Sequence, residues 1–148
     1  MRNELLVPIS CLLAVMLLLT LFPGCGSSKT TRAEGEPEYA PAIVDNLMSA
    51  FNEGKYAAFS KNFDTTMKQA VSESVFTEMH NTMKEKIGDY VSRKFISTGK
   101  EGVYTIVLYN AKFSKEPADV TVRFVFLESE ESVLISGLLF DSPKLREQ

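Results

Sequence analysis

A single change of pattern at Gly88 constrains the fold of this 148-residue chain more than any other feature. Before Gly88 the apolar residues recur with a period of about 3.6, which is typical of helices, and after it with a period of about two, which is typical of strands. Helices followed by a series of strands predict an α+β fold, in which the helices pack on one face of an antiparallel sheet. The length suits one domain.

The first half of the pattern predicts four helices. We expect them from Pro41 to Gly54, over 55–62, over 65–71, and from Ser72 or Ser74 to Gly88. Proline is favoured in the first turn of a helix and glycine just after the last turn, which supports the first pair of boundaries. Asp64 is placed to cap the third helix, because its side chain can accept a hydrogen bond from the backbone of the first turn.

The second half predicts a meander of four strands. They are expected over 90–98, 103–113, 120–127 and 133–140. The connections are short, so successive strands should be antiparallel neighbours. The middle connection, over 114–119, contains Pro117 and is predicted to be a loop. The α+β domain then spans residues 39–143, and residues 144–148 form a frayed tail.

The amino-terminal end carries the pattern of a secretory signal. Residues 5–22 are almost all apolar and uncharged, and Arg2 precedes them. The run ends in Phe-Pro-Gly-Cys at Cys25, which resembles a bacterial lipobox. The resemblance implies a signal peptide over 1–24, a lipidated Cys25, and an extracytoplasmic protein held by its lipid at the cell membrane or outer membrane. The alternatives are an uncleaved membrane anchor, since 18 residues span about 27 Å, and ordinary secretion.

Residues 25–38 predict a flexible tether between the lipid and the domain, because they lack large apolar side chains and are rich in small and charged ones. The other cysteine, Cys11, would leave with the signal peptide. The mature domain would then have no disulfide, and its core alone would hold the fold.

The order of several short motifs resembles one family. The matching residues are Phe51–Tyr56, Asn62–Met67, Gly88–Tyr90, Gly102–Tyr104 and Ile135–Phe140. Together they resemble the family called domain of unknown function 3887, which is grouped with nuclear-transport-factor-2-like cone folds. The resemblance implies amino-terminal helices packed on a curved four-stranded antiparallel meander, a nuclear-transport-factor-2-like or cystatin-like cone with a conical cavity. It implies no particular chemistry, because one fold hosts many functions.

Five residues are candidates for the lining of a ligand pocket: His80, Tyr104, Tyr109, Met79 and Met83. His80 borders the apolar face of its helix, so it either contacts a ligand or packs at the rim of the core. Methionines line adaptable apolar sites, and they also pack ordinary cores. Tyr104 and Tyr109 are an odd number of residues apart on one strand, so only one of them should point inward.

The composition removes several classes of function. The net charge is −3, so no basic surface for nucleic acid is expected. One histidine and two cysteines leave no zinc set and no nucleophilic triad, and no phosphate-binding loop is present. The acidic turn at 128–132 lacks the spacing of a calcium loop. We predict no cofactor and no metal ion, and no residue is assigned a catalytic role.

Three functions stay open. The first is a membrane-tethered, non-catalytic module that binds a small apolar or amphipathic ligand or a partner protein. The second is an envelope assembly protein: the strands over 103–113 and 133–140 are apolar on both faces, which predicts that a second copy or another envelope protein covers the outer face of the sheet. The third is an isomerase-like or dehydratase-like enzyme that uses His80, an acid such as Asp89, and a tyrosine.

Overall fold

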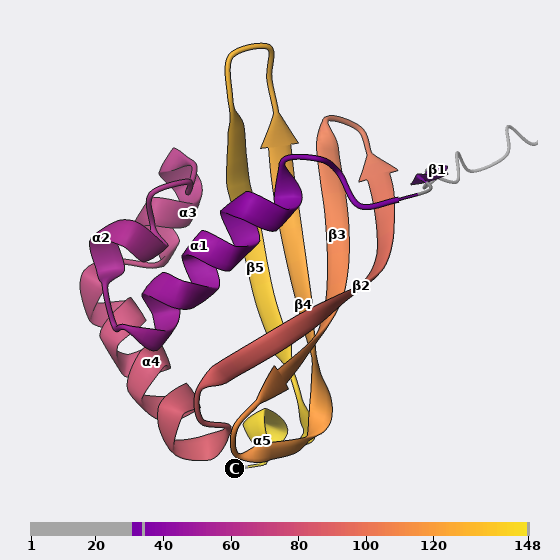
Figure 1. Ribbon diagram of the computed structural model, residues 1–148. Coiled ribbons are helices and arrows are strands. Elements are labelled where there is room, and N and C mark those ends of the chain that lie inside the picture. The colour runs from indigo at the N-terminus through magenta and orange to yellow at the C-terminus, as the bar shows by residue number, and fades with distance from the viewer. Residues whose placement is uncertain (1–30, 34, 148) are drawn as a thin grey trace, which may run out of the picture.

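The computed structural model describes residues 31–33 and 35–147, and Figure 1 shows its helices and strands. The helices are α1 (Ala40–Asn52), α2 (Tyr56–Phe59), α3 (Thr65–Ala70), α4 (Glu73–Lys86) and α5 (Pro143–Arg146). The strands are β1 (Thr31–Ala33), β2 (Tyr90–Glu101), β3 (Tyr104–Phe113), β4 (Glu116–Glu128) and β5 (Val133–Asp141).

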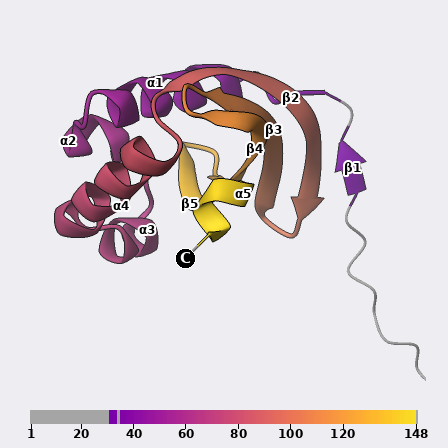
Figure 2. The ribbon, with the colours of Figure 1, turned by 90° about the horizontal axis from the view of Figure 1, so that it is seen from below.

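The fold class is α+β, as predicted. The strands form one antiparallel sheet in the order β1-β2-β3-β4-β5, so the predicted meander of four strands is confirmed and a short fifth strand is added at its edge. The sheet is curved, and α1 to α4 gather on one side of it (Figure 2). Asp64 caps α3 by accepting a hydrogen bond from the Met67 backbone at 2.7 Å, and α1 ends just before Gly54, whose φ is +67°.

The core lies between the helices and the inner face of the sheet. Its centre is Phe51 of α1, whose ring contacts those of Phe59, Phe76, His80 and Phe140 at centroid distances between 5.2 and 6.4 Å. Each aromatic pair of this kind adds about 0.5–1.5 kcal/mol beyond the burial of its surface. The other large side chains that are fully buried include Phe63, Val107, Tyr109, Phe124, Phe126 and Ile135.

The predicted loop over 114–119 is wrong for most of its length, because β4 begins at Glu116 and includes Pro117. Glu116 pairs with Phe113 of β3, and its buried side chain accepts hydrogen bonds from the backbones of Ala118 and Lys144, each at 3.3 Å. Proline is tolerated there because it stands at the start of the strand. The turn between β3 and β4 is therefore much shorter than predicted.

The predicted frayed tail over 144–148 is helical at its start. Ser142 caps α5 by accepting a hydrogen bond from the Leu145 backbone at 3.2 Å, and Leu145 packs against the core. Arg146 forms an ion pair with Asp141 at 2.6 Å. These contacts hold the helix against β5 and so give residues 143–146 a fixed place.

The predicted tether over 25–38 also differs from the structure where the structure describes it. Thr31 to Ala33 form β1, with Thr31 opposite Lys100 and Ala33 opposite Thr98 of β2. The predicted signal peptide over 1–24 and the predicted lipid site Cys25 lie outside the described residues. Within the described ranges, no helix is both long enough and apolar enough to cross a membrane.

Candidate functional site

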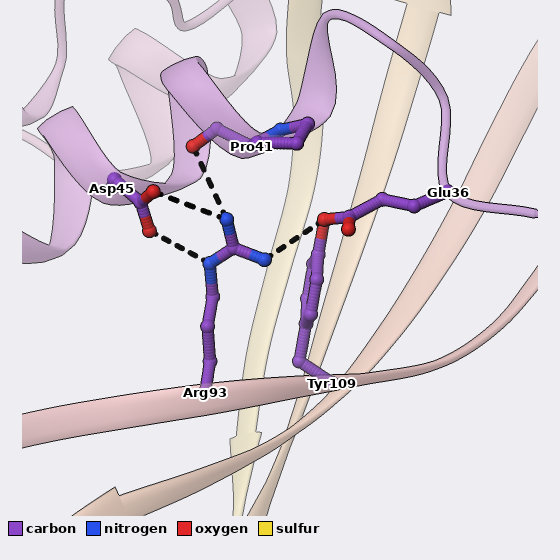
Figure 3. Close-up of polar contacts among 5 residues, drawn as sticks. All are labelled: Glu36, Pro41, Asp45, Arg93 and Tyr109. Atoms are coloured by element: carbon purple, nitrogen blue, oxygen red, sulfur yellow. Dashed lines mark hydrogen bonds and ion pairs between the residues drawn. The ribbon is translucent and has the colours of Figure 1, made fainter.

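Four side chains form a charged cluster where the amino-terminal segment meets the sheet, and we call it the Arg93 latch: Glu36, Asp45, Arg93 and Tyr109 (Figure 3). The Arg93 guanidinium of β2 donates two hydrogen bonds to Asp45 of α1, at 2.7 and 3.2 Å, and one to Glu36 at 2.8 Å. The Tyr109 hydroxyl of β3 donates to the same Glu36 oxygen at 2.6 Å. The latch therefore ties the segment before α1, α1 itself and two strands together.

The electrostatics of the latch follow from burial. The Arg93 side chain is 13% exposed and its guanidinium carbon lies 4.6 Å from the centre of the Tyr109 ring. Burial by itself would lower the pKa of Arg93, but the hydrogen bonds to Asp45 and Glu36 raise it above its usual value. Burial, and then the hydrogen bond to Glu36, raise the pKa of Tyr109. At neutral pH the arginine is charged and the phenol keeps its proton, so Tyr109 acts as a donor.

A second polar group also contacts the segment at the start of α1. Glu128 of β4 accepts a hydrogen bond from the Tyr39 hydroxyl at 2.8 Å and another from the Thr105 hydroxyl, and Lys100 lies 3.7 Å away. The Thr105 hydrogen bond is the largest cause of a lowered pKa at Glu128. Tyr39 immediately precedes α1, so this group also holds the start of α1 on the sheet.

A lowered carboxyl pKa predicts a loss of stability in acid. Glu128 stabilises the fold above its usual pKa, and this contribution disappears as the pH falls through the lower pKa of the folded state. At pH 7 the free energy of unfolding of the Glu128→Gln variant should be about 1 kcal/mol lower than that of the wild type. Between pH 5 and pH 3 the free energy of unfolding should fall less in the variant than in the wild type. Urea unfolding at several pH values measures both. If the free energy of unfolding depends on pH in the same way in both proteins, the protonation of Glu128 is not linked to folding.

The space between the latch and the core is closed. The space beneath Arg93 has no room for a water molecule. Its lining includes Val44 and Met48 of α1 and Tyr109, Val122 and Phe124 of the sheet. Side chains therefore fill the space between α1 and the sheet beneath Arg93.

Another hollow of the described part of the chain borders α4, and we call it the α4–β5 groove. It has a volume of about 480 Å³ and lies between α4, β5 and α5. Its lining is mostly apolar, and Glu78 is the one charged residue in it. The lining residues are Val75, Glu78, Met79, Thr82, Met83, Leu138, Leu139, Phe140 and Leu145. A volume of this size lies within the usual range for sites that bind small molecules.

The structure separates the five predicted pocket residues into three places. Met79 and Met83 line the α4–β5 groove. Tyr109 is fully buried in the latch, whereas Tyr104 is 41% exposed on the outer face of the sheet, so the predicted opposite orientation of the two tyrosines is confirmed. His80 packs between the rings of Phe51 and Phe76.

The residues of the enzyme hypothesis do not meet. His80 Nε2 is buried without a hydrogen-bond partner among the described residues. Asp89 instead pairs with Lys84, and Tyr109 bonds to Glu36. A general base needs a proton partner within hydrogen-bond reach, and no such contact joins these groups. In the described ranges, no three residues of the metal-binding types lie close enough to hold an ion.

The sequence analysis does not predict the latch, and of the groove lining it names only Met79 and Met83. Arg93 stands at an inward-facing position of β2, opposite Ala111 of β3. A charged residue at such a position was the available signal, since buried charges are almost always paired. Its partner Glu36 is 57 residues away in the sequence and lies in the predicted tether, so the pair could not be read from spacing. Leu145, which lines the groove, lies in the predicted frayed tail.

The comparisons with known proteins concern most of this domain. A family model described as a protein of unknown function, DUF3887, matches residues 44–136. That range includes Asp45, Arg93 and Tyr109 of the latch, and it ends before the β5 and α5 residues of the groove. A search of curated proteins found no match. Because the family model covers more than half of the chain, this protein belongs to the DUF3887 family.

Proposed function

We propose that this protein is a membrane-tethered, non-catalytic binding module outside the cytosol, and that its ligand site is the α4–β5 groove. The observation that carries the proposal is the contrast between two spaces: the space beneath Arg93 has no room for a water molecule, whereas the groove offers about 480 Å³. A ligand can reach the groove without unfolding the core.

The tether is the part of the proposal that depends on the amino-terminal sequence. An uncharged apolar run ends in Phe-Pro-Gly-Cys, and Cys25 is the residue that would carry the lipid. Two or three acyl chains hold a protein stably in a membrane, because each buried methylene contributes about 0.8 kcal/mol. In this proposal the domain lies at the surface of a cell membrane or outer membrane.

The finer description of the fold is also a proposal. A curved antiparallel sheet with helices on its inner side supports a nuclear-transport-factor-2-like or cystatin-like cone. In this domain the core would occupy the space inside the cone and the latch would close it. The proposed ligand site is therefore the α4–β5 groove.

The lining of the groove defines the chemistry of the ligand. Met79 and Met83 are flexible and polarizable, so they adapt to apolar groups of different shape. Leu138, Phe140 and Leu145 supply the opposite wall. Glu78 disfavours an anion at the rim. A neutral or cationic amphiphile with a single apolar chain fits these properties best.

A second candidate function is the docking of a partner or of a second copy on the outer face of the sheet. Tyr104, Leu127 and Leu134 lie side by side there on three neighbouring strands, and Ile106 and Val125 form the next row. These side chains are partly exposed, and an envelope protein could cover them. Analytical ultracentrifugation that finds only monomers at micromolar concentrations would count against self-association.

Charged substitutions on the rim of the groove test the ligand site. The Val75→Glu and Leu139→Glu variants alter opposite walls at exposed positions, and glutamate suits the first turn of α4. Each variant should bind the neutral dye Nile red at least fivefold more weakly than the wild type does. Decan-1-ol should also bind each variant at least fivefold more weakly, as measured by its displacement of the dye. Val91 is exposed and lines none of the hollows described above, so Val91→Glu is the matched control. Equal affinities in all three variants would contradict the proposed site.

A further inference from the structure

The turn between β2 and β3 exposes two neighbouring apolar side chains. Gly102, with φ of +60°, takes the first position of a two-residue turn, and Val103 takes the second. Val103 is 65% exposed and Tyr104, the next residue, is 41% exposed. Turn positions usually carry polar residues, so this pair, which we call the hairpin tip, is unusual for a surface that faces water alone.

The direction of β1 places the hairpin tip at the end of the domain where the chain enters. Thr31 lies opposite Lys100 of β2, and Ala33 lies opposite Thr98. Because the two strands are antiparallel, the first residue of β1 is the one nearest the hairpin tip. Figure 1 shows β1 and the β2–β3 turn at the same end of the molecule, with α5 at the other.

The length of chain before β1 limits how far the domain can lie from its anchor. Cys25 precedes Thr31 by six residues, which reach at most about 20 Å. The hairpin tip begins three residues beyond Lys100, within this reach. Val91 lies nine residues from Lys100 in the other direction, about 30 Å along the strand. An anchored Cys25 therefore keeps the hairpin tip within reach of the bilayer, whereas Val91 lies near the other end of β2.

We infer that the hairpin tip is a second membrane contact, and that Val103 and Tyr104 enter the lipid interface and orient the tethered domain on the bilayer. This inference rests on the proposed anchor at Cys25. Tyrosine favours the interface between lipid and water, where its ring is buried and its hydroxyl stays hydrated. The contact needs little affinity of its own, because a short tether gives an effective concentration in the millimolar range.

The charges at this end of the domain favour neutral lipid as the partner. Glu101 is exposed beside the hairpin tip, and Glu130 and Glu131 are exposed in the β4–β5 turn at the same end of the sheet. The nearby Lys100 is paired with Glu128. These carboxylates would be repelled by anionic headgroups, so the contact is apolar and should weaken when the membrane is anionic.

Single tryptophans test the inference, because the chain contains none. Val103→Trp and Val91→Trp are matched, since the two valines are 65% and 62% exposed. Each full-length protein, expressed with its own leader and purified with its lipid, is reconstituted into phosphatidylcholine vesicles. Brominated phosphatidylcholine should quench at least half of the Val103→Trp emission and less than a tenth of the Val91→Trp emission. Phosphatidylglycerol vesicles at low salt should reduce the quenching at position 103.

The other outcomes separate this inference from the proposed function. Equal quenching at the two positions, in a protein whose intact mass includes the acyl chains, overturns the membrane contact and leaves the anchor in place. An intact mass without acyl chains overturns the lipid anchor and the contact that rests on it. A blue shift of the Val103→Trp emission that grows with protein concentration in the absence of lipid assigns the hairpin tip to a second copy of this chain and also overturns the inference.

Discussion

Replacing Arg93 by methionine is expected to lower the free energy of unfolding by about 3 kcal/mol. Methionine retains most of the apolar contact with Tyr109 but removes the guanidinium, so the Glu36 carboxylate, at 25% exposure, loses its charged partner. Asp45 is 60% exposed and can be rehydrated, which keeps the loss below that of a fully buried pair. Urea unfolding of the purified domain measures the change.

Arg123→Met is the matched control, because Arg123 is exposed on the outer face of β4, opposite Leu139 of β5. It should change the free energy of unfolding by less than about 0.5 kcal/mol. A double-mutant cycle of Arg93→Met with Glu36→Gln should give a coupling of at least about 1 kcal/mol. If Arg93→Met is no less stable than Arg123→Met, the latch does not hold the amino-terminal segment on the sheet.

The Cys25→Ala variant is expected to lose all incorporation of labelled palmitate, because no other residue of the lipobox pattern can form the thioether. The wild-type protein should begin at Cys25 and carry the mass of two or three acyl chains. The variant should carry none and should keep its leader. Labelling of growing cells, followed by intact-mass spectrometry, measures both properties.

Cys11→Ala provides the control, since it removes the only other cysteine and lies within the predicted signal peptide. It should leave the palmitate label unchanged. A wild-type protein that keeps residues 1–24 and carries no label would indicate an uncleaved membrane anchor. A wild-type protein that lacks residues 1–24 and carries no label would indicate ordinary secretion.

Local pattern predicted the elements of the fold well, because the apolar period reflects which side of each element is buried. The change at Gly88 separates α4 from β2, and Asp64 caps α3 as expected. Tyr104 and Tyr109 are an odd number of residues apart on β3, and this spacing correctly predicts that they lie on opposite faces of the sheet. Each of these features depends on residues that are close together in the sequence.

The errors arise where distant residues decide the structure. Pro117 reads as a loop residue, but β4 starts before it because Glu116 receives backbone hydrogen bonds from Ala118 and from Lys144. The segment around Glu36 reads as a solvated tether, but Arg93 and Tyr109 bind it. Composition describes what a segment does alone, and a few specific partners are enough to override it.

The same limit applies to the candidate site. Met79 and Met83 are predicted as candidates for a pocket lining, and the hollow that they border lies against β5 and α5. An apolar helix face cannot by itself show which of its edges meets a filled core and which meets an open groove. That distinction depends on packing around the whole helix.

Methyl NMR of the protein labelled at its methionines tests most directly whether the interior is closed and the groove is open. Met48 lines the closed interior, Met79 and Met83 line the α4–β5 groove, and Met67 in α3 serves as a reference. Decan-1-ol should shift the methyl signals of Met79 and Met83 and leave those of Met48 and Met67 in place. A shift of Met48 with no change at Met79 and Met83 would place the ligand inside the domain and contradict the account.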